Sequence, residues 1–234
     1  MRVSVVIPVY NEAGAIGRLL AELPVGLAHE VLVVDGGSTD GTQAVAASAG
    51  ATVVPQRGRG YGAACLTGAQ DATGDVVVFM DGDYSDPPAS LGDLLAPLLA
   101  DGAGLVLGNR ESGMEAGALP MHARLGNRVA LVLLLALFGR RLNDLPSYKA
   151  IRRSHLLALG VQDLHYGWTA ELIARAVSSG LRIREVPIRY RVRVGESKVS
   201  GTLQGSLRAG WAIIWALLRV RFGPTQPSLS ATPR

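Results

Sequence analysis

Short runs of β-branched and other apolar residues alternate with stretches of helical periodicity through the first half of the chain. The apolar runs fall at residues 3–8, 30–35, 51–56, 75–81 and 103–109, and amphipathic stretches lie between them at 13–23, 41–50, 62–72 and 90–100. An apolar run followed by a helical pattern and then by another run is typical of a βα unit, and successive units build a parallel sheet. The pattern therefore predicts an α/β fold with a mostly parallel central sheet flanked by helices.

The second half changes character from Pro120 onward. We predict helices over 121–141 and 167–180, a strand over 147–153 and a long strand over 181–194. In this last strand apolar and basic residues alternate, so a period of two places three guanidiniums on one face, those of Arg189, Arg191 and Arg193. An amphipathic helix is predicted at about 202–222, and the Pro/Ser/Thr-rich residues 223–234 predict a disordered tail. We expect residues 1–222 to form a single domain.

Composition and charge narrow the class of protein. The 234 residues are 48% hydrophobic and 5% aromatic, and the net charge of +4 favours anionic partners such as phosphorylated small molecules, anionic lipid or nucleic acid. The single cysteine, Cys65, excludes an internal disulfide framework and fits a reducing compartment. The apolar run at the N-terminus is too short for a signal-peptide core, so we expect a cytoplasmic location.

Polar side chains follow the predicted strands at the points where these end. Tyr10, Asn11 and Glu12 follow the first, Asp35 the second, Asp81 and Asp83 the fourth, and Asn109 and Arg110 the fifth. Ligands of parallel α/β sheets bind at the carboxyl ends of the strands. One crevice is therefore expected to collect these residues.

The stretch "VVVFMDGDYSDPP" delivers three aspartates to one turn directly after a buried strand. Asp81 and Asp83 can direct carboxylate oxygens toward one point, and oxygen ligands suit Mg²⁺ or Mn²⁺. A metal with so few protein ligands completes its shell with water and nucleotide phosphates, which predicts a diphosphate site; the alternative is a polar turn in which Asp83 bonds to backbone. Asp86, before Pro87 and Pro88, is interpreted as a helix cap.

Together these residues resemble a known family. The segments "VVIPVYNEAGAIGRLL", "VLVVDGGSTDGT", "GYGAACLTGAQDATGDVVVFMDGDYSDPP", "GNR" and "EVPIRYRVRVGESKVSGT" are similar to family-2 glycosyltransferases, most closely the branch of dolichyl-phosphate mannosyltransferases and polyprenyl-phosphate glucosyltransferases. The resemblance covers about residues 3–202. It implies a GT-A fold that binds a nucleotide-sugar through a divalent metal, Mg²⁺ or Mn²⁺, at Asp81 and Asp83.

The resemblance also implies a nucleoside pocket lined by Pro8, Tyr10, Glu12 and Asp35. Glu12 and Asp35 are acceptors able to bind ribose hydroxyls or base N–H groups. Each has an alternative interpretation. Glu12 can stand in the first turn of a helix, where negative charge is favoured, and Asp35 can form an Asx turn.

A phosphate nucleophile is already ionised and requires positive charge instead of a general base. The resemblance suggests that Arg110 and Arg124 contact an acceptor phosphate, that Arg128 replaces a serine there, and that Lys198, with Arg193, neutralises the leaving diphosphate. Arg128 and Arg193 are also candidates to bind the acceptor phosphate. Alternatively these cations form a solvated face or pair with acids. Asp144 is the reserve candidate for a general base. Ser85 and the stretch "LPSYK" depart from the mannosyl branch, which leaves the sugar and the acceptor open.

Two apolar runs of ten residues, Val129–Phe138 and Ala209–Leu218, are bracketed by arginines. As helices of about 15 Å they are too short to span a bilayer. Cationic ends with Trp211 and Trp215 beside them favour helices that lie in a membrane interface, although core helices explain the runs too. We therefore expect a peripheral protein on the inner face of the cell membrane.

The leading hypothesis is an inverting transfer of a hexose from a GDP-mannose or UDP-glucose type donor to a polyprenyl or dolichyl phosphate. A second hypothesis keeps this donor but uses a small soluble hydroxyl acceptor with Asp144 as base. A third is a nucleotide-binding module without catalysis. A nucleotidyltransferase is disfavoured because the early G-x-G-T-R loop is missing, and nucleic acid is not expected because the arginines lack an aromatic-interleaved groove. A homo-oligomer is left open.

Overall fold

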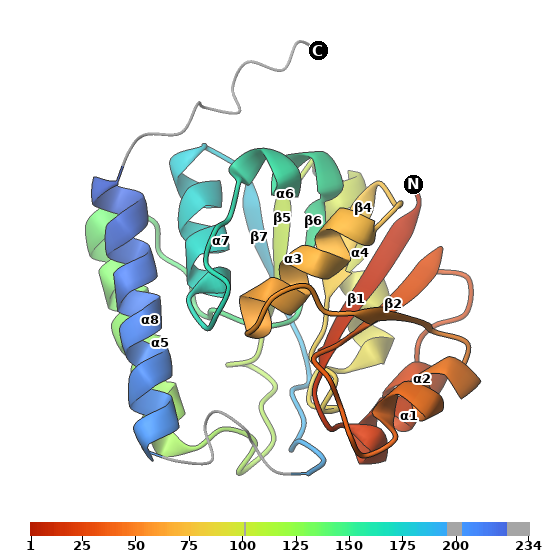
Figure 1. Ribbon diagram of the computed structural model, residues 1–234. Coiled ribbons are helices and arrows are strands. Elements are labelled where there is room, and N and C mark those ends of the chain that lie inside the picture. Colours follow the sequence, from red (N-terminus) through yellow and green to blue (C-terminus); the bar gives the residue numbers. More distant parts are fainter. Residues whose placement is uncertain (101, 196–202, 224–234) are drawn as a thin grey trace.

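The computed structural model describes residues 1–100, 102–195 and 203–223, which form one seven-stranded sheet with helices on both faces (Figure 1). The strands are β1 Val3–Val9, β2 Glu30–Asp35, β3 Thr52–Pro55, β4 Val76–Phe79, β5 Leu105–Asn109, β6 Lys149–Arg152 and β7 Ile183–Pro187. The helices are α1 Ala13–Ala21, α2 Thr42–Ser48, α3 Tyr61–Asp71, α4 Leu91–Ala100, α5 Met121–Phe138, α6 Arg153–Leu159, α7 Trp168–Ser178 and α8 Leu203–Phe222, with a short 3₁₀ turn, η1, at Pro88–Ser90.

The strand order is β3-β2-β1-β4-β6-β5-β7. β1 pairs in parallel with β2 and β4, and β5 pairs in parallel with β7, whereas β6 runs antiparallel between β4 and β5. The predicted α/β fold with a mostly parallel sheet is confirmed. The carboxyl ends of the parallel strands all lie at the lower edge of the sheet in Figure 1.

Most of the apolar runs become strands that are buried on both faces, whereas β3 at the edge of the sheet is partly exposed. All four residues of β4 are buried, and in β1 only Pro8 is partly exposed. Helices cover both faces because each βα crossover returns over the sheet. On one face the rings of Phe79 in β4 and Trp168 in α7 meet edge to face at 4.8 Å. This core holds the strand ends in fixed positions.

The predicted long strand over 181–194 is wrong beyond Pro187. After β7 the chain crosses the lower edge as an irregular segment, because its backbone partners there are loops and not a strand. Ile188 N donates to Asn109 O at 3.0 Å, Arg191 N to Ser85 O at 2.9 Å and Val194 N to Asp83 O at 2.9 Å. Buried Ile188 and Tyr190 still alternate with the arginines, but those arginines contact different partners and form no common face.

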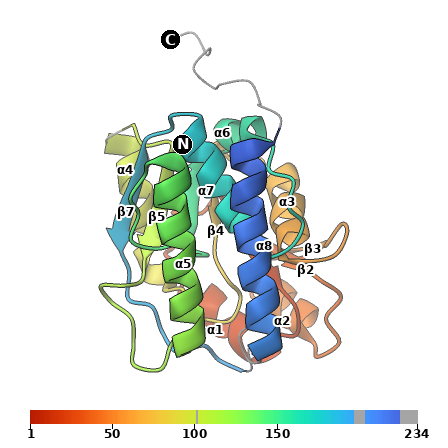
Figure 2. The same cartoon turned by 90° about the vertical axis from the view of Figure 1, so that its left-hand side faces the viewer.

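Helices α5 and α8 lie side by side at one end of the sheet (Figure 2). Both begin at the edge where the parallel strands end. Ala130 and Leu134 of α5 are buried, but only 11% of the helix is buried inside the protein. Its 18 residues have a mean hydropathy of 1.4, so by length and composition alone this helix could cross a membrane. The run Val129–Phe138 was expected to be too short to span a bilayer. That expectation does not hold for the whole helix, which begins eight residues earlier, at Met121.

Helix α8 covers nearly the range predicted for the amphipathic helix, and a buried ionic cluster attaches it to α7. Glu171, which is fully buried, accepts hydrogen bonds from Arg175 at 2.7 Å and from Arg219 of α8 at 2.6 Å. Leu217 joins the main core. Of the predicted tail, only Gly223 lies within the described residues.

Candidate active site

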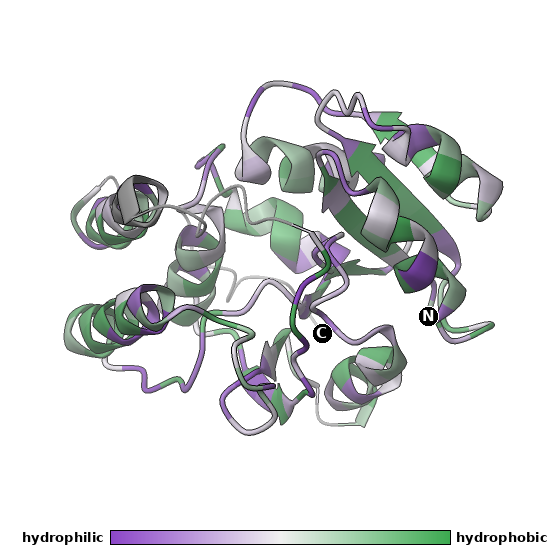
Figure 3. Ribbon diagram, turned by 90° about the horizontal axis from the view of Figure 1, so that it is seen from below, coloured by the Kyte–Doolittle hydropathy of each residue, from purple (hydrophilic) through white to green (hydrophobic). Residues whose placement is uncertain are grey.

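Several loops converge at the lower edge of the sheet, where the parallel strands end. Figure 3 views the molecule from this edge, with predominantly hydrophobic strands behind and hydrophilic residues in the loops. Strands β1, β2, β4 and β5 all run in the same direction. The loops that follow them therefore all reach this edge. The predicted crevice residues therefore come from neighbouring elements.

The turn that carries Asp81, Gly82 and Asp83, called the D-x-D turn below, follows the end of β4. A Cβ atom at Gly82 would come within 2.5 Å of Val9 Cγ1, so glycine is required for the turn to pack against the end of β1. Ser85 donates to Asp83 Oδ1 from its backbone N at 3.0 Å and also from its hydroxyl. A polar turn in which Asp83 bonds to backbone was the predicted alternative to metal binding. It describes Oδ1 of Asp83 but not Oδ2.

The remaining oxygens of the two carboxylates differ in their partners. Asp83 Oδ2 lies 3.3 Å from the guanidinium of Arg193, which also lies 3.4 Å from Glu12 Oε1. Asp81 Oδ1 is buried and has no hydrogen-bond partner among the described residues. Burial raises the pKa of Asp81 to about 6, and the charge of Asp83 adds to this rise. A buried anionic oxygen without a partner is costly, and a divalent cation would relieve that cost.

These two carboxylates therefore fit a hard divalent cation. Among the described residues no group of three or more His, Cys, Asp or Glu side chains is arranged to hold a metal ion. Asp81 and Asp83 alone supply the oxygens, which agrees with a cation that takes most of its ligands from water and substrate.

The interpretation of Asp86 as a helix cap is wrong. The residue before η1 is Pro87, and no side chain caps this turn. Asp86 is instead fully buried, and its Oδ2 accepts hydrogen bonds from Asp81 N at 3.0 Å and from Ser147 Oγ at 2.9 Å. Burial raises its pKa to about 8, with the charge of Asp81 as the next cause. The sequence pattern missed this because the partner Ser147 is 61 residues away.

The loop after β1 carries the other predicted donor-site residues. Tyr10 is half exposed, Pro8 is partly buried within β1 and Glu12 is buried at the start of α1. Glu12 accepts backbone hydrogen bonds from the first turn of α1 through its carbonyl oxygen, while its carboxylate faces Arg193. The predicted alternative, a residue at the helix start, and the predicted role at the donor site are both compatible with this position.

Asp35 organises the loop after β2. Its Oδ2 accepts hydrogen bonds from Gly37 N at 3.0 Å, Ser38 N at 3.0 Å and Gln43 Nε2 at 2.7 Å. Burial opposes the ionised form, but these donors outweigh it, and the pKa of Asp35 falls below its usual value. The Asx-turn alternative therefore describes Oδ2. Within the part of the chain that the structure describes, Oδ1 accepts one long hydrogen bond, of 3.3 Å, from Ser38 N.

Two non-glycine residues at this edge have left-handed backbone conformations. Asn11, between Tyr10 and Glu12, has φ of 54°, and Tyr84, between Asp83 and Ser85, has φ of 69°. Such conformations cost of order 1–3 kcal/mol and persist where the surroundings fix them. Tyr84 is fixed by hydrogen bonding to Glu22 and by Arg191 stacked on its ring at 4.6 Å.

Arg110, predicted to contact an acceptor phosphate, forms a buried ion pair. Its guanidinium donates twice to Asp144, with both distances at 2.7 Å, and stacks over Tyr190 at 5.2 Å from the ring centroid. Asp144 also accepts from Asn127 Nδ2 at 3.0 Å and from Leu145 N at 2.8 Å. Burial alone would lower the pKa of Arg110, but Asp144 reverses this and raises it. Asp144 is thus fully engaged, which disfavours it as a general base.

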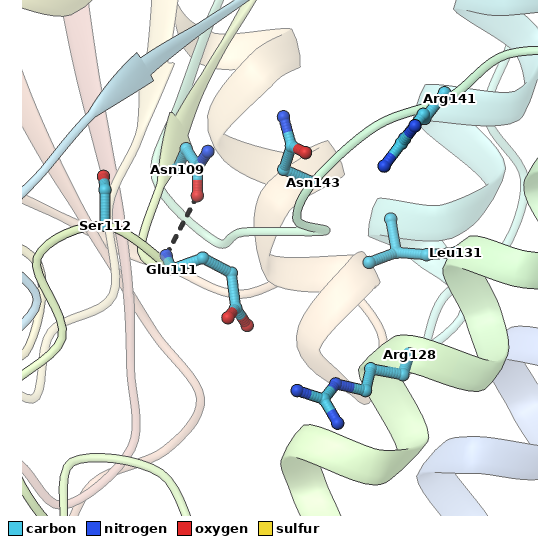
Figure 4. A pocket seen from close by; sticks show the side chains of 7 residues that line it. All are labelled: Asn109, Glu111, Ser112, Arg128, Leu131, Arg141 and Asn143. Atoms are coloured by element: carbon cyan, nitrogen blue, oxygen red, sulfur yellow. Dashed lines mark hydrogen bonds between the residues drawn. The ribbon is translucent and has the colours of Figure 1, made fainter.

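A hollow of about 600 Å³ opens between the end of β5 and the middle of α5 (Figure 4). Arg128 of α5 and Arg141 of the following loop point into it from one side, and Asn109, Glu111 and Asn143 face them. Neither guanidinium has a partner among the described residues, so both present free positive charge to this space. Two arginines of this kind are suited to bind phosphate.

The other predicted cations are placed differently. Arg124 is exposed on α5 and does not line this hollow, and Lys198 lies outside the described residues. Arg193 contacts Asp83 and Glu12, not the hollow. Sequence reasoning missed Arg141 and Glu111 as lining residues. Arg141 was interpreted only as the cationic end of a helix, and the helix in fact ends at Phe138.

The comparisons with known proteins agree with this edge geometry. Residues 4–160 match the family model described as glycosyl transferase family 2. The chain is a family-2 glycosyltransferase. An uncharacterized glycosyltransferase of Mycobacterium tuberculosis is 39% identical over 210 residues, which cover 88% of this chain and 94% of that protein. The dolichyl-phosphate hexose transferase of Haloferax volcanii is 35% identical over 221 residues, covering 93% of this chain and 95% of that one.

Solved glycosyltransferase structures are also similar to this one. Glucosyl-3-phosphoglycerate synthase from Mycobacterium tuberculosis, in complex with Mn²⁺, uridine-diphosphate and glucosyl-3-phosphoglycerate, matches with a TM-score of 0.77 and 27% identity over 96% of this chain and 81% of that chain. The same synthase has been solved with Mg²⁺ and uridine-diphosphate. The resemblance inferred from the motifs and the GT-A fold are therefore confirmed.

Proposed function

We propose that this glycosyltransferase moves a hexose from a nucleotide-sugar of the GDP-mannose or UDP-glucose type to a polyprenyl or dolichyl phosphate, with inversion, on the inner face of the cell membrane. The observation that carries the proposal is the hollow with Arg128 and Arg141 unpaired, while Asp144 is held by Arg110. That arrangement offers positive charge to an anionic acceptor. The carboxylate of Asp144 is bound by Arg110 and is therefore not available as a general base. The dolichyl-phosphate relative supports the same acceptor class.

On the donor side, Asp81 and Asp83 would hold Mg²⁺ or Mn²⁺, the ions found with uridine-diphosphate in the solved neighbours. When bound, the cation supplies charge that stabilises the leaving diphosphate. Glu12 and Asp35 accept hydrogen bonds at the ends of β1 and β2, where the nucleoside would lie. Arg193, beside Asp83, supplies further positive charge on the leaving-group side. Lys198 would add to it, as the resemblance suggests.

On the acceptor side, the phosphate would be held by Arg128 and Arg141, with Arg124 exposed on the same helix. Strands β4 and β5 are separated only by β6, so the carboxyl ends of these two strands lie about 10 Å apart across the sheet. An ionised phosphate oxygen needs no proton removed before it attacks the anomeric carbon.

Membrane contact is supported by the outer face of α5 and α8. Met121 is 86% exposed and Trp211 is 69% exposed, and both lie near arginines. An exposed apolar face with cationic residues beside it suits an interface with anionic headgroups. A lipid-linked acceptor requires such contact, and Arg128 of the same helix α5 lines the hollow.

A second candidate uses a soluble hydroxyl acceptor. Glu111 faces the hollow and could serve as general base there, and one solved neighbour holds glucosyl-3-phosphoglycerate. In that reaction the arginines would bind the phosphate of the acceptor while a hydroxyl attacks.

The test supplies labelled UDP- and GDP-hexoses with Mn²⁺ and either a short polyprenyl phosphate in detergent or 3-phosphoglycerate, and partitions the product between butanol and water. We expect label in butanol. Arg128→Gln and Arg141→Gln should each raise the KM for the acceptor about 10- to 100-fold, since each loses a hydrogen bond to a charged group, while the KM for the donor stays unchanged. Arg18→Gln, which alters an exposed arginine on α1, is the matched control.

Glu111→Gln separates the two acceptors. With a phosphate nucleophile its kcat stays within a few-fold of wild type, whereas loss of a general base lowers kcat by about 10²-fold or more. Label confined to water, together with such a loss in Glu111→Gln, would replace the lipid-phosphate proposal with the hydroxyl one.

A further inference from the structure

A fully buried lysine lies behind the D-x-D turn. Lys149 begins β6, the antiparallel strand between β4 and β5, and pairs in register with Phe79, two residues before Asp81. Its ammonium lies 5.3 Å from the ring centroid of Trp168 and 5.9 Å from that of Phe79. Within the described part of the chain it forms no ion pair. Lysine is almost never fully buried without a paired charge, so its position requires a reason.

The hydrogen bonds of Lys149 lead to the turn. Its Nζ donates to Ser147 O at 2.8 Å, and Ser147 in turn donates its hydroxyl to Asp86 Oδ2 at 2.9 Å. The same Asp86 oxygen accepts the backbone N–H of Asp81 at 3.0 Å. Three hydrogen bonds therefore connect the lysine to the backbone of Asp81, and the covalent structure of Ser147 links the first of them to the second. The only other hydrogen-bond partner of the lysine among the described residues, Thr169 Oγ1 at 3.1 Å, belongs to α7 and leads away from the turn.

The carboxylate of Asp86 binds the turn, and one oxygen of the Asp81 carboxylate is left without a partner among the described residues. Among the described residues, Asp81, Asp83 and Asp86 are not arranged as three ligands of one metal ion. Asp86 holds the peptide and leaves Asp81 Oδ1 free.

We propose that Lys149 is a positioning residue, which acts through Ser147 and Asp86 to fix the backbone of Asp81 so that its carboxylate faces the donor site. The proposal rests on the proposed function for the identity of the ligand at Asp81, but the hydrogen-bond path is independent of it. Outer partners of metal-binding carboxylates commonly change metal affinity by about 10- to 100-fold when they are removed.

The test compares Lys149→Met, Ser147→Ala and their double variant with wild type, and uses Thr169→Val as the matched control. The first readout is Mn²⁺ affinity of the purified protein in the presence of UDP or GDP, measured by electron paramagnetic resonance without any acceptor. We expect each single variant to bind Mn²⁺ about 10- to 100-fold more weakly and the double variant to be no weaker than Lys149→Met, because both changes cut one path. Thr169→Val should bind as wild type does.

The second readout is hydrogen exchange of the Asp81 amide, with the Val33 amide of β2 as the internal reference for global opening. Exchange at Asp81 should accelerate at least tenfold in Lys149→Met and in Ser147→Ala, without acceleration at Val33. If Lys149→Met does not fold, Ser147→Ala carries the same expectation with the lysine in place.

Unchanged exchange at Asp81, or additive losses in the double variant, would overturn the positioning role. Absence of Mn²⁺ binding in wild type, with faster Asp81 exchange in the variants, would instead overturn the proposed donor site and leave the positioning role standing. A thermal midpoint of Lys149→Met equal to or above that of wild type supports the proposal. If the lysine served only stability, its replacement would lower the midpoint.

Discussion

At the residue scale, Lys149 shows how burial changes the chemistry of a side chain. Burial lowers its pKa from 10.5 to about 8, although Cys65, Asp81 and Asp86 oppose the shift. Below about pH 8 the lysine is charged in both the folded and the unfolded chain, so the cost of burying that charge is constant. Between about 8 and 10.5 only the unfolded chain binds the proton, and the free energy of unfolding therefore rises with pH.

This gives a prediction about pH. Lys149→Met removes the titration, so its stability relative to wild type should decline by about 1–3 kcal/mol as the pH rises from 8 to 10.5. Urea unfolding across that range measures the difference, and tyrosine titrations cancel because they are common to both proteins. Arg18→Gln, which alters an exposed arginine on α1 and leaves the surroundings of Lys149 unchanged, should keep the wild-type slope. Parallel stability curves for Lys149→Met and wild type would contradict the lowered pKa.

Arg110 illustrates the limit of motif reasoning at single residues. The sequence motif places it at a strand end, which is correct, but its function depends on Asp144, 34 positions later. An arginine whose guanidinium is already bound by a carboxylate is less available to an incoming phosphate than Arg141, which has no described partner. No local pattern distinguishes these two arginines.

At the element scale, α5 and α8 carry apolar residues on surfaces that no described part of the chain covers. Met121, Leu125, Val129 and Val132 follow one another at helical spacing on α5, and Trp211, Trp215 and Phe222 do so on α8, all of them exposed. The helices pack side by side, so the two stripes belong to one end of the molecule (Figure 2). Patches of this kind mark interaction surfaces.

The prediction is that this surface binds anionic vesicles. Trp211→Ser with Trp215→Ser, or Leu125→Ser with Val132→Ser, should weaken binding to phosphatidylglycerol-containing vesicles at least tenfold, since each buried Trp contributes about 1–2 kcal/mol. Co-sedimentation measures the partition. Leu157→Ser, on α6 and 45% exposed, is the control and should bind normally. Equal loss in the control, or no loss in either double variant, would count against a membrane-facing surface.

At the scale of the whole molecule, ligand binding should stabilise the fold. A ligand that binds only the native state at 100 times its Kd adds about 2.7 kcal/mol, which corresponds to a rise in Tm of about 5–10 °C for a chain of this size. We expect GDP or UDP to give such a rise only with Mn²⁺, as monitored by differential scanning fluorimetry. Asp83→Asn should abolish the Mn²⁺-dependent part, whereas Asp93→Asn, an exposed aspartate on α4, should not. A nucleotide shift that ignores Mn²⁺ would contradict the cation at Asp81 and Asp83.

The fold was largely predictable because hydrophobic periodicity is a local property. The alternation of apolar runs and amphipathic stretches gave the strands β1 to β5 and the helices between them, and strands buried on both faces require helices on both faces. The segment after Pro187 was not predictable. Alternation alone does not reveal whether a neighbouring strand is present, and here the neighbours are the loops that carry Asn109, Ser85 and Asp83.

For the candidate site, the sequence determined which chemical groups arrive at the edge of the sheet: two carboxylates after β4, acceptors after β1 and β2, and arginines in the second half. Only the tertiary structure decided how they are paired. Asp144 engages Arg110, Arg193 lies between Asp83 and Glu12, and Asp86 binds the Asp81 peptide and Ser147. These pairings join residues far apart in the chain, and their strength depends on burial, which arises only when the sheet and its helices have excluded water.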